Sequence, residues 1–410
     1  MGEYSSGKSY QKLIHFPKTG ILCTKDNLAR LIKRNRGWFG KIYHFTPVTY
    51  CLPNETKQFT DLFTRQAVNG NQAKQMWICK PTDLSRGRKI SIISNLNDLY
   101  YDQQSVIQEY IDNPLLIRGT KWDMRIYVLI TQMRPLKLYL FKEGIVRFSS
   151  ERYDTNQLGN VFSHLTNSSI NKYAATNVSD GHGSGLKWSF SQLKSFLLTM
   201  GQDFDLMWVQ IEQIIQLTCI NLCSLVPDLK CCFELLGFDI MLDDRMKPWL
   251  LEVNSSPAMS METDIDHLVK PALIRDAISL CPFESYQDWL ERNKTKTSTK
   301  TSNIHQNFFS KRTTATNKRD EGCHQDPPLA PHLAAAQRKL ARASENSHSL
   351  YDNTTTKSDK TTKLSHNKME SLDVTSSTAA TPYSSALNSN KNLPNAAANQ
   401  SDITNNNSFS

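Results

Sequence analysis

Two apolar runs joined by a polar linker constrain the fold of this chain more than any other feature: FDIML (residues 238–242) and WLLEVN (residues 249–254). The linker, DDRMKP, is a β-hairpin signal between runs of strand length. A hairpin that turns within it sets Asp239 opposite Glu252 on the neighbouring strand. Because strand side chains alternate with a period of two, Asn254 is expected on the same face as both acids.

The same register predicts an apolar second face for the hairpin. With the turn centred between Arg245 and Met246, Met241 is expected to face Leu250. The side chains expected to point into a core are those of Phe238, Ile240, Leu251 and Val253.

Opposed carboxylates on paired strands need a cation between them, because like charges that face each other destabilise a sheet. Two carboxylates and an amide carbonyl are all oxygen donors. They suit Mg²⁺ shared with phosphate oxygens, whereas softer metals prefer Cys or His. The hairpin therefore predicts a Mg²⁺ site at Asp239, Glu252 and Asn254. The alternative is an exposed strand face whose acids meet water.

Basic residues that can hold the phosphates of such a site occur upstream. Lys80 ends the apolar run MWIC (residues 76–79), and SRGR (residues 85–88) follows at loop distance. Lys and Arg near a single Gly in a flexible loop can fold over phosphates. QEYI (residues 108–111) ends another apolar strand and is expected to form a hinge whose backbone groups bind an adenine edge.

The segment KWDMR (residues 121–125) combines charged residues with a strand period. Lys121, Asp123 and Arg125 share one face of the expected strand. The other face carries Trp122, Met124 and Ile126. Three charges on one face indicate a polar cleft, and the alternative is a solvated sheet face.

Charge is spread unevenly along the chain, whose formal net charge is +9. Residues 1–45 carry nine Lys and Arg against two acids, and residues 291–319 carry eight against Glu291, so each segment has a net charge of +7. Two basic flanks favour docking on an extended anionic partner, with nucleic acid, anionic membrane and the acidic tails of tubulin as candidates. The alternative is that they only keep the chain soluble.

Strand-like and helix-like segments follow each other without regular alternation, which favours an α+β fold over a doubly wound sheet. Residues 134–150 are expected to form two strands that turn at Glu143-Gly144, and residues 266–280 a helix interrupted at Pro271. The nine cysteines form no CxxC pair and are expected to be reduced and mostly buried. No 18-residue apolar span occurs, so a soluble protein is expected.

Nine ordered segments together resemble the tubulin tyrosine ligase-like family: WICKPTDLSRGR, VIQEYIDNPLLI, KWDMRIYVLI, GIVRF, SHLTNSSINK, GLKW, FELLGFDIML, KPWLLEVNSSP and HLVKPALI. They cover roughly residues 12–285. The resemblance is strongest to the glutamylase type and implies an ATP-grasp fold. It also implies an ATP-dependent ligase that joins glutamate to glutamate side chains of tubulin C-terminal tails through an acyl phosphate.

The resemblance implies a role for each matched residue. The residues implied to hold ATP are Lys80, Arg86, Gly87, Gln108, Glu109, Tyr110, Ile111, Lys121, Asp123, Thr166 and Asn167. Those implied to hold the incoming glutamate are Arg147, Ser169, Lys187 and Lys270. The implied catalytic residues are Lys121, Arg125 and Glu252, with Arg125 facing the acceptor. Asp239, Glu252 and Asn254 are implied to bind Mg²⁺.

The family also suggests a division of the chain into lobes. The expected parts are a partial, basic N-terminal lobe (residues 1–70), a central ATP-grasp lobe (71–185), a C-terminal ATP-grasp lobe with the Mg²⁺ site (186–290) and a disordered basic tail rich in Ser, Thr and Asn (291–410). The front of the family's N-terminal lobe is missing.

Two positions depart from the family pattern. Lys89 stands where the family usually has Gly, and it is expected to stiffen the loop and add charge over the phosphates. Ser168 stands where the family usually has an aromatic residue.

Three functions remain open on these grounds: an active tubulin glutamate ligase, a microtubule-binding pseudoenzyme, and a glycine or tyrosine ligase of the same fold. The retained Asp239, Glu252 and Asn254 favour an enzyme. The expected partners are microtubules and free glutamate, with no nucleic acid or membrane, and the chain is expected to act as a monomer. The expected location is the cytoplasm and cytoskeleton, with a cilium or flagellum as a further candidate.

Overall fold

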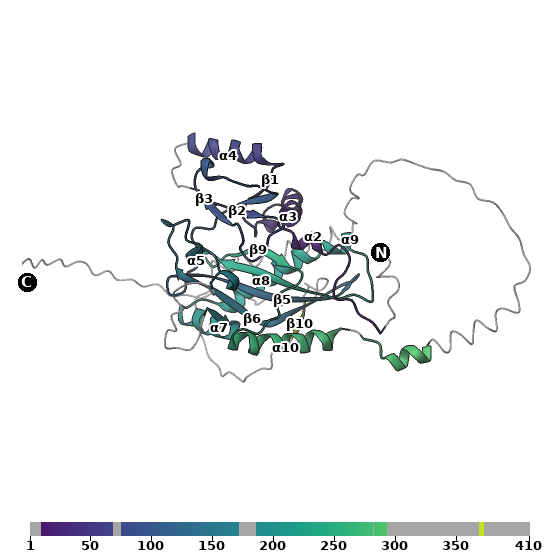
Figure 1. Ribbon diagram of the computed structural model, residues 1–410. Helices are drawn as coiled ribbons and strands as arrows, with labels where there is room; N and C mark the ends of the chain where they lie inside the picture. The colour runs from purple at the N-terminus through teal and green to yellow at the C-terminus, as the bar shows by residue number, and fades with distance from the viewer. Residues whose placement is uncertain (1–9, 69–74, 172–185, 282, 293–368, 373–410) are drawn as a thin grey trace, which may run out of the picture. The chain divides into compact units, whose positions relative to one another are not determined.

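Two antiparallel β-sheets organise the residues that the computed structural model describes, which are 10–68, 75–171, 186–281, 283–292 and 369–372. The smaller sheet has the strand order β1-β4-β2-β3, and the larger has the order β10-β6-β5-β8-β9, with β7 also paired to β6 (Figure 1). The strands are β1 (Thr49–Leu52), β2 (Trp77–Pro81), β3 (Ser91–Ile93), β4 (Ser105–Glu109), β5 (Thr120–Met133), β6 (Leu136–Arg152), β7 (Lys187–Ser189), β8 (Glu234–Leu242), β9 (Pro248–Asn254) and β10 (Met369–Leu372).

Helices pack against both sheets. They are α2 (Gly20–Cys23), α3 (Lys25–Phe39), the 3-10 helix η1 (Gly40–Tyr43), α4 (Thr56–Val68), η2 (Leu96–Asp98), α5 (Val161–His164), α6 (Ser168–Asn171), α7 (Phe190–Thr199), α8 (Phe204–Cys219), α9 (Leu222–Leu225) and α10 (Asp264–Leu280). This mixture of helices and antiparallel sheets confirms the expected α+β fold.

The larger sheet is covered on both faces. Ile126 and Val128 of β5 belong to a hydrophobic cluster shared with α7 and α8, whereas Tyr127 and Leu129 belong to a cluster shared with α10. Full burial of such a side chain contributes about 1.5–3 kcal/mol relative to exposure. A strand buried on both faces is a rigid support for the charged residues at its N-terminal half.

One face of the smaller sheet is covered by α4. Phe59 of α4 meets Trp77 of β2 edge to face, with ring centroids 5.0 Å apart, and both pack with Ile107 of β4. Strand alternation leaves Lys80 and Gln108 on the opposite face, toward the larger sheet.

β6 is one continuous strand, so the turn expected at Glu143-Gly144 is wrong. The buried Glu143 carboxylate accepts hydrogen bonds from the backbone N–H groups of Phe190 and Ser191, at the start of α7, and from the Ser191 hydroxyl at 2.7 Å. A Cβ on Gly144 would lie 2.4 Å from Phe190 Cζ and 2.6 Å from the Arg125 carbonyl oxygen. Glycine is therefore required by close packing against a helix and not by a turn.

α10 is also continuous, so the expected interruption at Pro271 is wrong. The helix starts with a capping box formed by Thr263 and Asp266. Pro271 lies on its exposed face, where water can satisfy the carbonyl that loses its helical partner.

β10 corrects the expectation that residues 291–410 are disordered throughout, because Met369–Leu372 pairs antiparallel with Leu138–Phe141 of β6. Residues 291 and 292 end a short helical segment. The rest of that expectation concerns residues 293–368 and 373–410, which lie outside the described residues.

Strand pairing crosses the expected lobe boundaries at residues 70 and 185. β1 joins β2, β3 and β4 in the smaller sheet, whereas β5 and β6 belong to the larger sheet with β8 and β9. The division into lobes therefore stays a prediction from the family, while the observed sheets separate residues 49–109 from the strands that follow residue 120.

The cysteines agree with the expectation of reduced, mostly buried thiols. The eight cysteines in the described ranges form no disulfide there, and six of them are buried. A search of the described helices found none with the length and apolar character needed to cross a membrane.

Candidate active site

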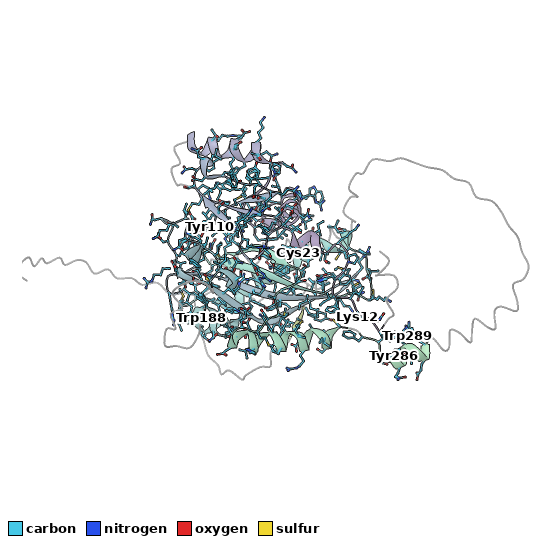
Figure 2. All side chains as sticks on the ribbon, viewed as in Figure 1. Lys12, Cys23, Tyr110, Trp188, Tyr286 and Trp289 are labelled. Carbon is cyan, nitrogen blue, oxygen red and sulfur yellow. The ribbon has the colours of Figure 1, made fainter. Side chains whose placement is uncertain are left out.

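An open cavity of about 880 Å³ lies between the two sheets. β2 and β4 form one wall, β5, β8 and β9 form the other, and two loops near residues 84–90 and 164–167 close the sides. Figure 2 places Tyr110 at this junction. All eleven residues expected to hold ATP line the cavity, together with Arg147, Asp239 and Glu252. The other expected residues, Arg125, Asn254, Ser169, Lys187 and Lys270, lie outside its lining.

Lysines give one end of the cavity its positive charge. Lys80 Nζ donates to Gln108 Oε1 at 2.8 Å, and Gln108 Nε2 donates to Thr49 Oγ1 at 2.9 Å. Burial lowers the pKa of Lys80 to about 8. Burial, and next the charge of Lys80, lower the pKa of Lys121 to about 7. Each lysine gains its full charge most readily beside a bound anion.

Tyr110 and His164 hold Lys121 in place. Lys121 Nζ donates to Tyr110 Oη at 2.9 Å and lies 4.2 Å from the Tyr110 ring centroid. His164 Nε2 lies 3.1 Å from the Gln157 carbonyl oxygen, and His164 Nδ1 lies 2.8 Å from Tyr110 Oη. The tautomer protonated on Nε2 satisfies both contacts, with Tyr110 as the donor to Nδ1.

The loop that carries Arg86 and Gly87 packs tightly against α6. Arg86 and Gly87 have φ values of 62° and 75°. A Cβ on Gly87 would lie 2.3 Å from Ile170 Cδ1 and 3.0 Å from Asn167 Oδ1. Ser169 Oγ donates to the Arg86 carbonyl at 3.2 Å, so Ser169 supports this loop. Glycine is needed at position 87 for both its backbone conformation and the contact.

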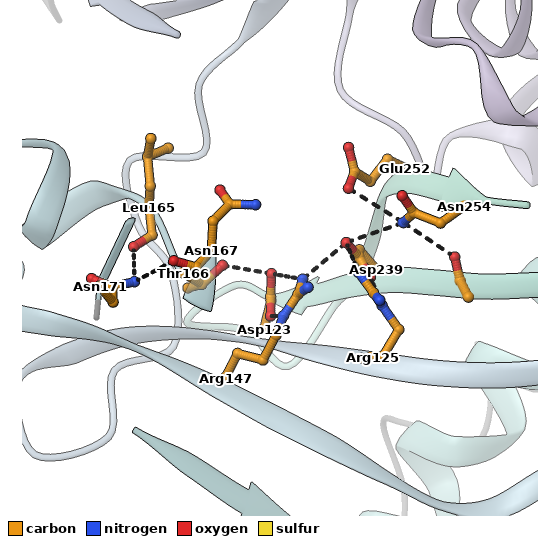
Figure 3. A network of polar contacts seen from close by, with 11 residues as sticks. Asp123, Arg125, Arg147, Leu165, Thr166, Asn167, Asn171, Asp239, Glu252 and Asn254 are labelled. Carbon is orange, nitrogen blue, oxygen red and sulfur yellow. Dashed lines mark hydrogen bonds and ion pairs between the residues drawn. The ribbon is translucent and has the colours of Figure 1, made fainter. Parts of the chain in front are cut away.

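Alternating charges cross the floor of the cavity on neighbouring strands (Figure 3). Arg147 donates to the Asp123 carboxylate from Nε at 2.7 Å and from Nη2 at 2.6 Å. Arg125 donates to the Asp239 carboxylate in the same way, from Nε at 2.5 Å and from Nη2 at 3.0 Å. Arg147 Nη2 also lies 2.9 Å from Asp239 Oδ2. Thr166 Oγ1 donates to Asp123 Oδ2 at 2.6 Å. This array holds Asp123 and Asp239 each with a fork of guanidinium donors.

The β8–β9 hairpin sets Asp239 directly opposite Glu252, as expected. Beyond that pair the register shifts by one residue, so Leu250 faces Ile240 and not Met241. Leu251 consequently lines the cavity, whereas Leu250 is fully buried in the core. The expectation that Leu251 points into the core is wrong because a β-bulge interrupts the alternation there.

The two opposed carboxylates differ in their protonation equilibria. Although burial opposes ionisation, the charges of Arg125 and Arg147 hold the pKa of Asp239 well below its usual range. Burial and then the charge of Asp239 raise the pKa of Glu252. Asn254 Nδ2 is 3.3 Å from Glu252 Oε1 and 3.5 Å from Asp239 Oδ2.

The donor set of Glu252 and Asn254 fits a hard cation. Glu252 borders the cavity, and no Lys, Arg or His of the described ranges forms an ion pair with it, so its poorly solvated charge favours a bound cation. A half-turn of the Asn254 amide would present an oxygen in place of its nitrogen. Asp239 is already bound by two arginines, and the described residues contain no cluster of three or more His, Cys, Asp or Glu side chains arranged for a metal.

Lys187 and Lys270 lie together beside Arg147. Lys187 is paired directly with Arg147 across β6 and β7. Lys187 Nζ and Lys270 Nζ each lie 2.7 Å from a different oxygen of Asp266, which is fully buried. Although burial opposes ionisation, hydrogen bonds from both lysines hold the pKa of Asp266 below its usual range. One carboxylate thus compensates two lysines. Together with Arg125 and Arg147, which bind Asp123 and Asp239, the group has four positive and three negative charges.

Lys25, His164 and Asp266 belong to this arrangement although the sequence reasoning assigned them no role. Lys25, the first residue of α3, lines the cavity and donates to the Leu84 carbonyl at 2.7 Å. It lies 55 residues from Lys80, and no local motif marks it. His164 lies inside the recognised segment SHLTNSSINK. Asp266 lies four residues before Lys270, a spacing that places both on one side of a helix. The sequence therefore contained a weak indication that each belongs to the site.

The sequence profile of the tubulin-tyrosine ligase family matches residues 4–288, more than half of the chain. This chain belongs to the tubulin-tyrosine ligase family. The matched range contains the whole cavity and all the residues described around it.

Several curated members of the family are similar to this chain. Probable tubulin polyglutamylase TTLL2 of Homo sapiens is 43% identical over 284 residues, covering 68% of this chain and 48% of the relative. Tubulin polyglutamylase TTLL6 of Mus musculus is 39% identical over 290 residues, covering 67% and 34%. Tubulin monoglutamylase TTLL4 of Homo sapiens is 37% identical over 294 residues, covering 68% and 24%. The expected resemblance to the glutamylase type is confirmed.

The chain spans about half the length of the two TTLL2 relatives, 48% of the human and 52% of the mouse protein.

Lys89, which departs from the family pattern, does not add charge over the cavity. Its φ is 53°, and its Nζ lies 2.6 Å from Asp102 Oδ2 on the exposed side of the loop. Lys89 is absent from the cavity lining, which includes its neighbours Arg86, Gly87 and Arg88. The expected charge over the phosphates is wrong because the left-handed backbone directs the side chain outward.

Proposed function

We propose that this chain is an ATP- and Mg²⁺-dependent ligase that adds glutamate to glutamate side chains in the acidic C-terminal tails of tubulin. One observation carries the proposal: one cavity brings together Lys80 on β2, Lys121 on β5 and the Asp239–Glu252 pair. The named activities of the glutamylase relatives support the choice of tubulin and glutamate.

The proposed reaction has two steps. A tail carboxylate attacks the γ-phosphorus of ATP, and the bond from that phosphorus to the oxygen of the β-phosphate breaks. ADP leaves, and the tail carries an acyl phosphate. The deprotonated amine of glutamate then attacks the acyl carbon, an amide forms and phosphate departs. Charge accumulates on phosphoryl oxygens in both steps, so positioned cations contribute most of the catalysis.

The phosphates are proposed to lie against Lys80, Lys121, Arg86 and the Gly87 backbone. Residues 108–111 form the end of β4 and the two residues after it, on the cavity wall, where their backbone groups would take the adenine. Asp123 would reach the ribose or a phosphate, and Thr166 and Asn167 would complete the nucleotide site.

Glu252, Asn254 and Asp239 are proposed to hold Mg²⁺, which when bound neutralises charge on the phosphate oxygens. Arg125, expected to face the acceptor, instead binds Asp239 outside the cavity lining. Its proposed role is therefore to orient that acid.

The incoming glutamate is proposed to bind near Arg147, Lys187 and Lys270. Among the described residues these cations and Arg125 share Asp123, Asp239 and Asp266 as acidic partners, which leaves one positive charge in excess. An anionic amino acid therefore fits them better than glycine or tyrosine. Ser169, also expected there, supports the Arg86 loop instead.

The remaining proposals follow from this activity. Microtubules and free glutamate are the proposed partners, the cytoskeleton is the proposed place of action, and the chain is proposed to work as a monomer without nucleic acid or membrane. The pseudoenzyme alternative loses part of its basis because Lys89 faces away from the cavity.

Incorporation of labelled amino acids tests the proposal. The full chain is incubated with microtubules, Mg·ATP and labelled glutamate, glycine or tyrosine. Glutamate should be incorporated, and Glu252→Gln should abolish incorporation while the exposed Glu291→Gln retains it. Retained microtubule pelleting with no incorporation would establish the pseudoenzyme, and preferred glycine or tyrosine incorporation would establish the third function.

A further inference from the structure

The outer edge of β6 is shared by two short strands from distant parts of the chain. β7 pairs with Ile145–Arg147, and β10 pairs with Leu138–Phe141 (Figure 1). An uncovered edge at this second segment would present unpaired N–H and C=O groups, which are a template for pairing with another chain. β10 therefore covers a part of the larger sheet whose backbone groups could otherwise pair with another chain.

β10 contacts both faces of that sheet. Leu372 is 7% exposed and belongs to the cluster shared with α7 and α8, whereas Met369 packs against the cluster shared with α10. The two residues are three apart, and the strand period sends them to opposite faces. An extended segment can make both contacts at once only on a sheet with an apolar cluster on each side.

Polar contacts fix the position of β10 along the edge. The Met369 N–H donates to Asp276 Oδ2 of α10 at 3.2 Å, and Glu370 forms an ion pair with Lys142 of β6. Backbone pairing with pockets for alternate side chains is the way a sheet edge recognises an extended peptide.

We propose that Leu138–Phe141, with Lys142 and Asp276, form a docking site for an extended segment of the pattern apolar, acidic, polar, apolar, and that Met369–Leu372 of the same chain occupy it. The register of four residue pairs and the matching contacts on both faces support this occupant. Docking covers the edge and attaches the C-terminal region to the ligase domain at a second point.

Paired cysteines test the register and the occupant together. Tyr139 faces Ser371, and directly opposed residues of antiparallel strands have Cα atoms about 4.5–5.5 Å apart, within disulfide range. In the full chain, Tyr139→Cys with Ser371→Cys should form a disulfide within one molecule under mild oxidation. Tyr139→Cys with Glu370→Cys should not, because these side chains point to opposite faces.

Nonreducing electrophoresis and peptide mapping read the result, and each single substitution controls for the nine natural cysteines. Disulfide-linked dimers would show that a second copy occupies the edge and would overturn the proposal. Equal yields from the two pairs would overturn the register.

Hydrogen exchange of the full chain gives a second measurement without cross-linking. Leu372→Asp should speed exchange of the amides in Leu138–Phe141 by about tenfold or more, whereas Ser371→Asp, the same charge at an exposed position, should change it less than about twofold. Amides of β8, which does not pair with β10, report any global unfolding. Unchanged exchange in Leu372→Asp would overturn the proposal.

Discussion

Asp239 and Glu252 face each other across the β8–β9 hairpin, yet their surroundings move the two pKa values in opposite directions. Asp239 lies between two guanidinium groups, while Glu252 is buried beside Asp239 itself. One acid thus anchors the arginines, and the other retains a charge that a bound cation would stabilise.

Substitutions of these two acids should therefore differ in their effect on stability. Asp239→Asn is expected to lower the free energy of unfolding at pH 7 by about 3–5 kcal/mol, because it leaves Arg125 and Arg147 without their shared carboxylate. Glu252→Gln is expected to leave this free energy equal or higher, while it lowers turnover by at least about 10²-fold. Urea unfolding and glutamate incorporation measure the two effects. Equal destabilisation by both variants would contradict the assignment.

The pH dependence of stability should distinguish the same pair. The lowered pKa of Asp239 gives stability that is present above the unfolded value of about 3.9 and is lost as the pH falls toward the folded value. The raised pKa of Glu252 has the opposite effect on stability. Above about pH 4.3 the folded state binds more protons than the unfolded state, so stability falls as the pH rises. Glu252→Gln should remove the decline in stability with rising pH that urea unfolding measures above about pH 4.3.

Nucleotide binding should take up protons near pH 8. The pKa of Lys121 is about 7 and that of Lys80 about 8 in the free chain, and a bound polyanion raises both. Calorimetric titrations at pH 8 in buffers of different ionisation enthalpy should show net proton uptake. Lys121→Met should reduce that uptake, and Lys57→Met, an exposed lysine of α4, should not. Binding without proton exchange at pH 8 would be inconsistent with these shifted lysines.

Asp266 should control the affinity for glutamate and not for ATP. Asp266→Asn removes the carboxylate that orients Lys187 and Lys270. Hydrogen bonds to charged groups contribute about 1.5–3 kcal/mol, so the KM for glutamate is expected to rise about tenfold or more with the KM for ATP unchanged. Asp264→Asn, an exposed acid in the first turn of the same helix, is the matched control. A parallel rise in both KM values would indicate general damage to the fold.

Lys89→Gly should leave activity unchanged. The lysine has a left-handed backbone that glycine adopts readily, and its side chain binds the exposed Asp102. Initial rates of glutamate incorporation with wild type and variant provide the comparison. A gain in turnover would revive the idea that this lysine hinders the phosphate loop.

The local sequence pattern predicted the face on which each side chain lies correctly where a strand has one polar and one apolar face. The alternation in residues 121–126 correctly separated Lys121 and Asp123 from Trp122, Met124 and Ile126. It failed at Glu143-Gly144, where Glu143 caps the start of a helix and Gly144 packs closely against Phe190. A turn and a tightly packed strand can share a local sequence, because only the partner in space distinguishes them.

The sequence by itself determined the α+β class, the Asp239–Glu252 pairing, the family and the eleven residues expected to hold ATP that line the cavity, since each follows from strand period or an ordered motif. Tertiary structure decided the rest. It bound Asp239 to Arg125 and Arg147, placed Lys187 on Asp266, brought Lys25 into the cavity and set Met369–Leu372 on the edge of β6. These relationships join residues tens to hundreds of positions apart. Their energies come from burial and charge pairing, which a local pattern cannot encode.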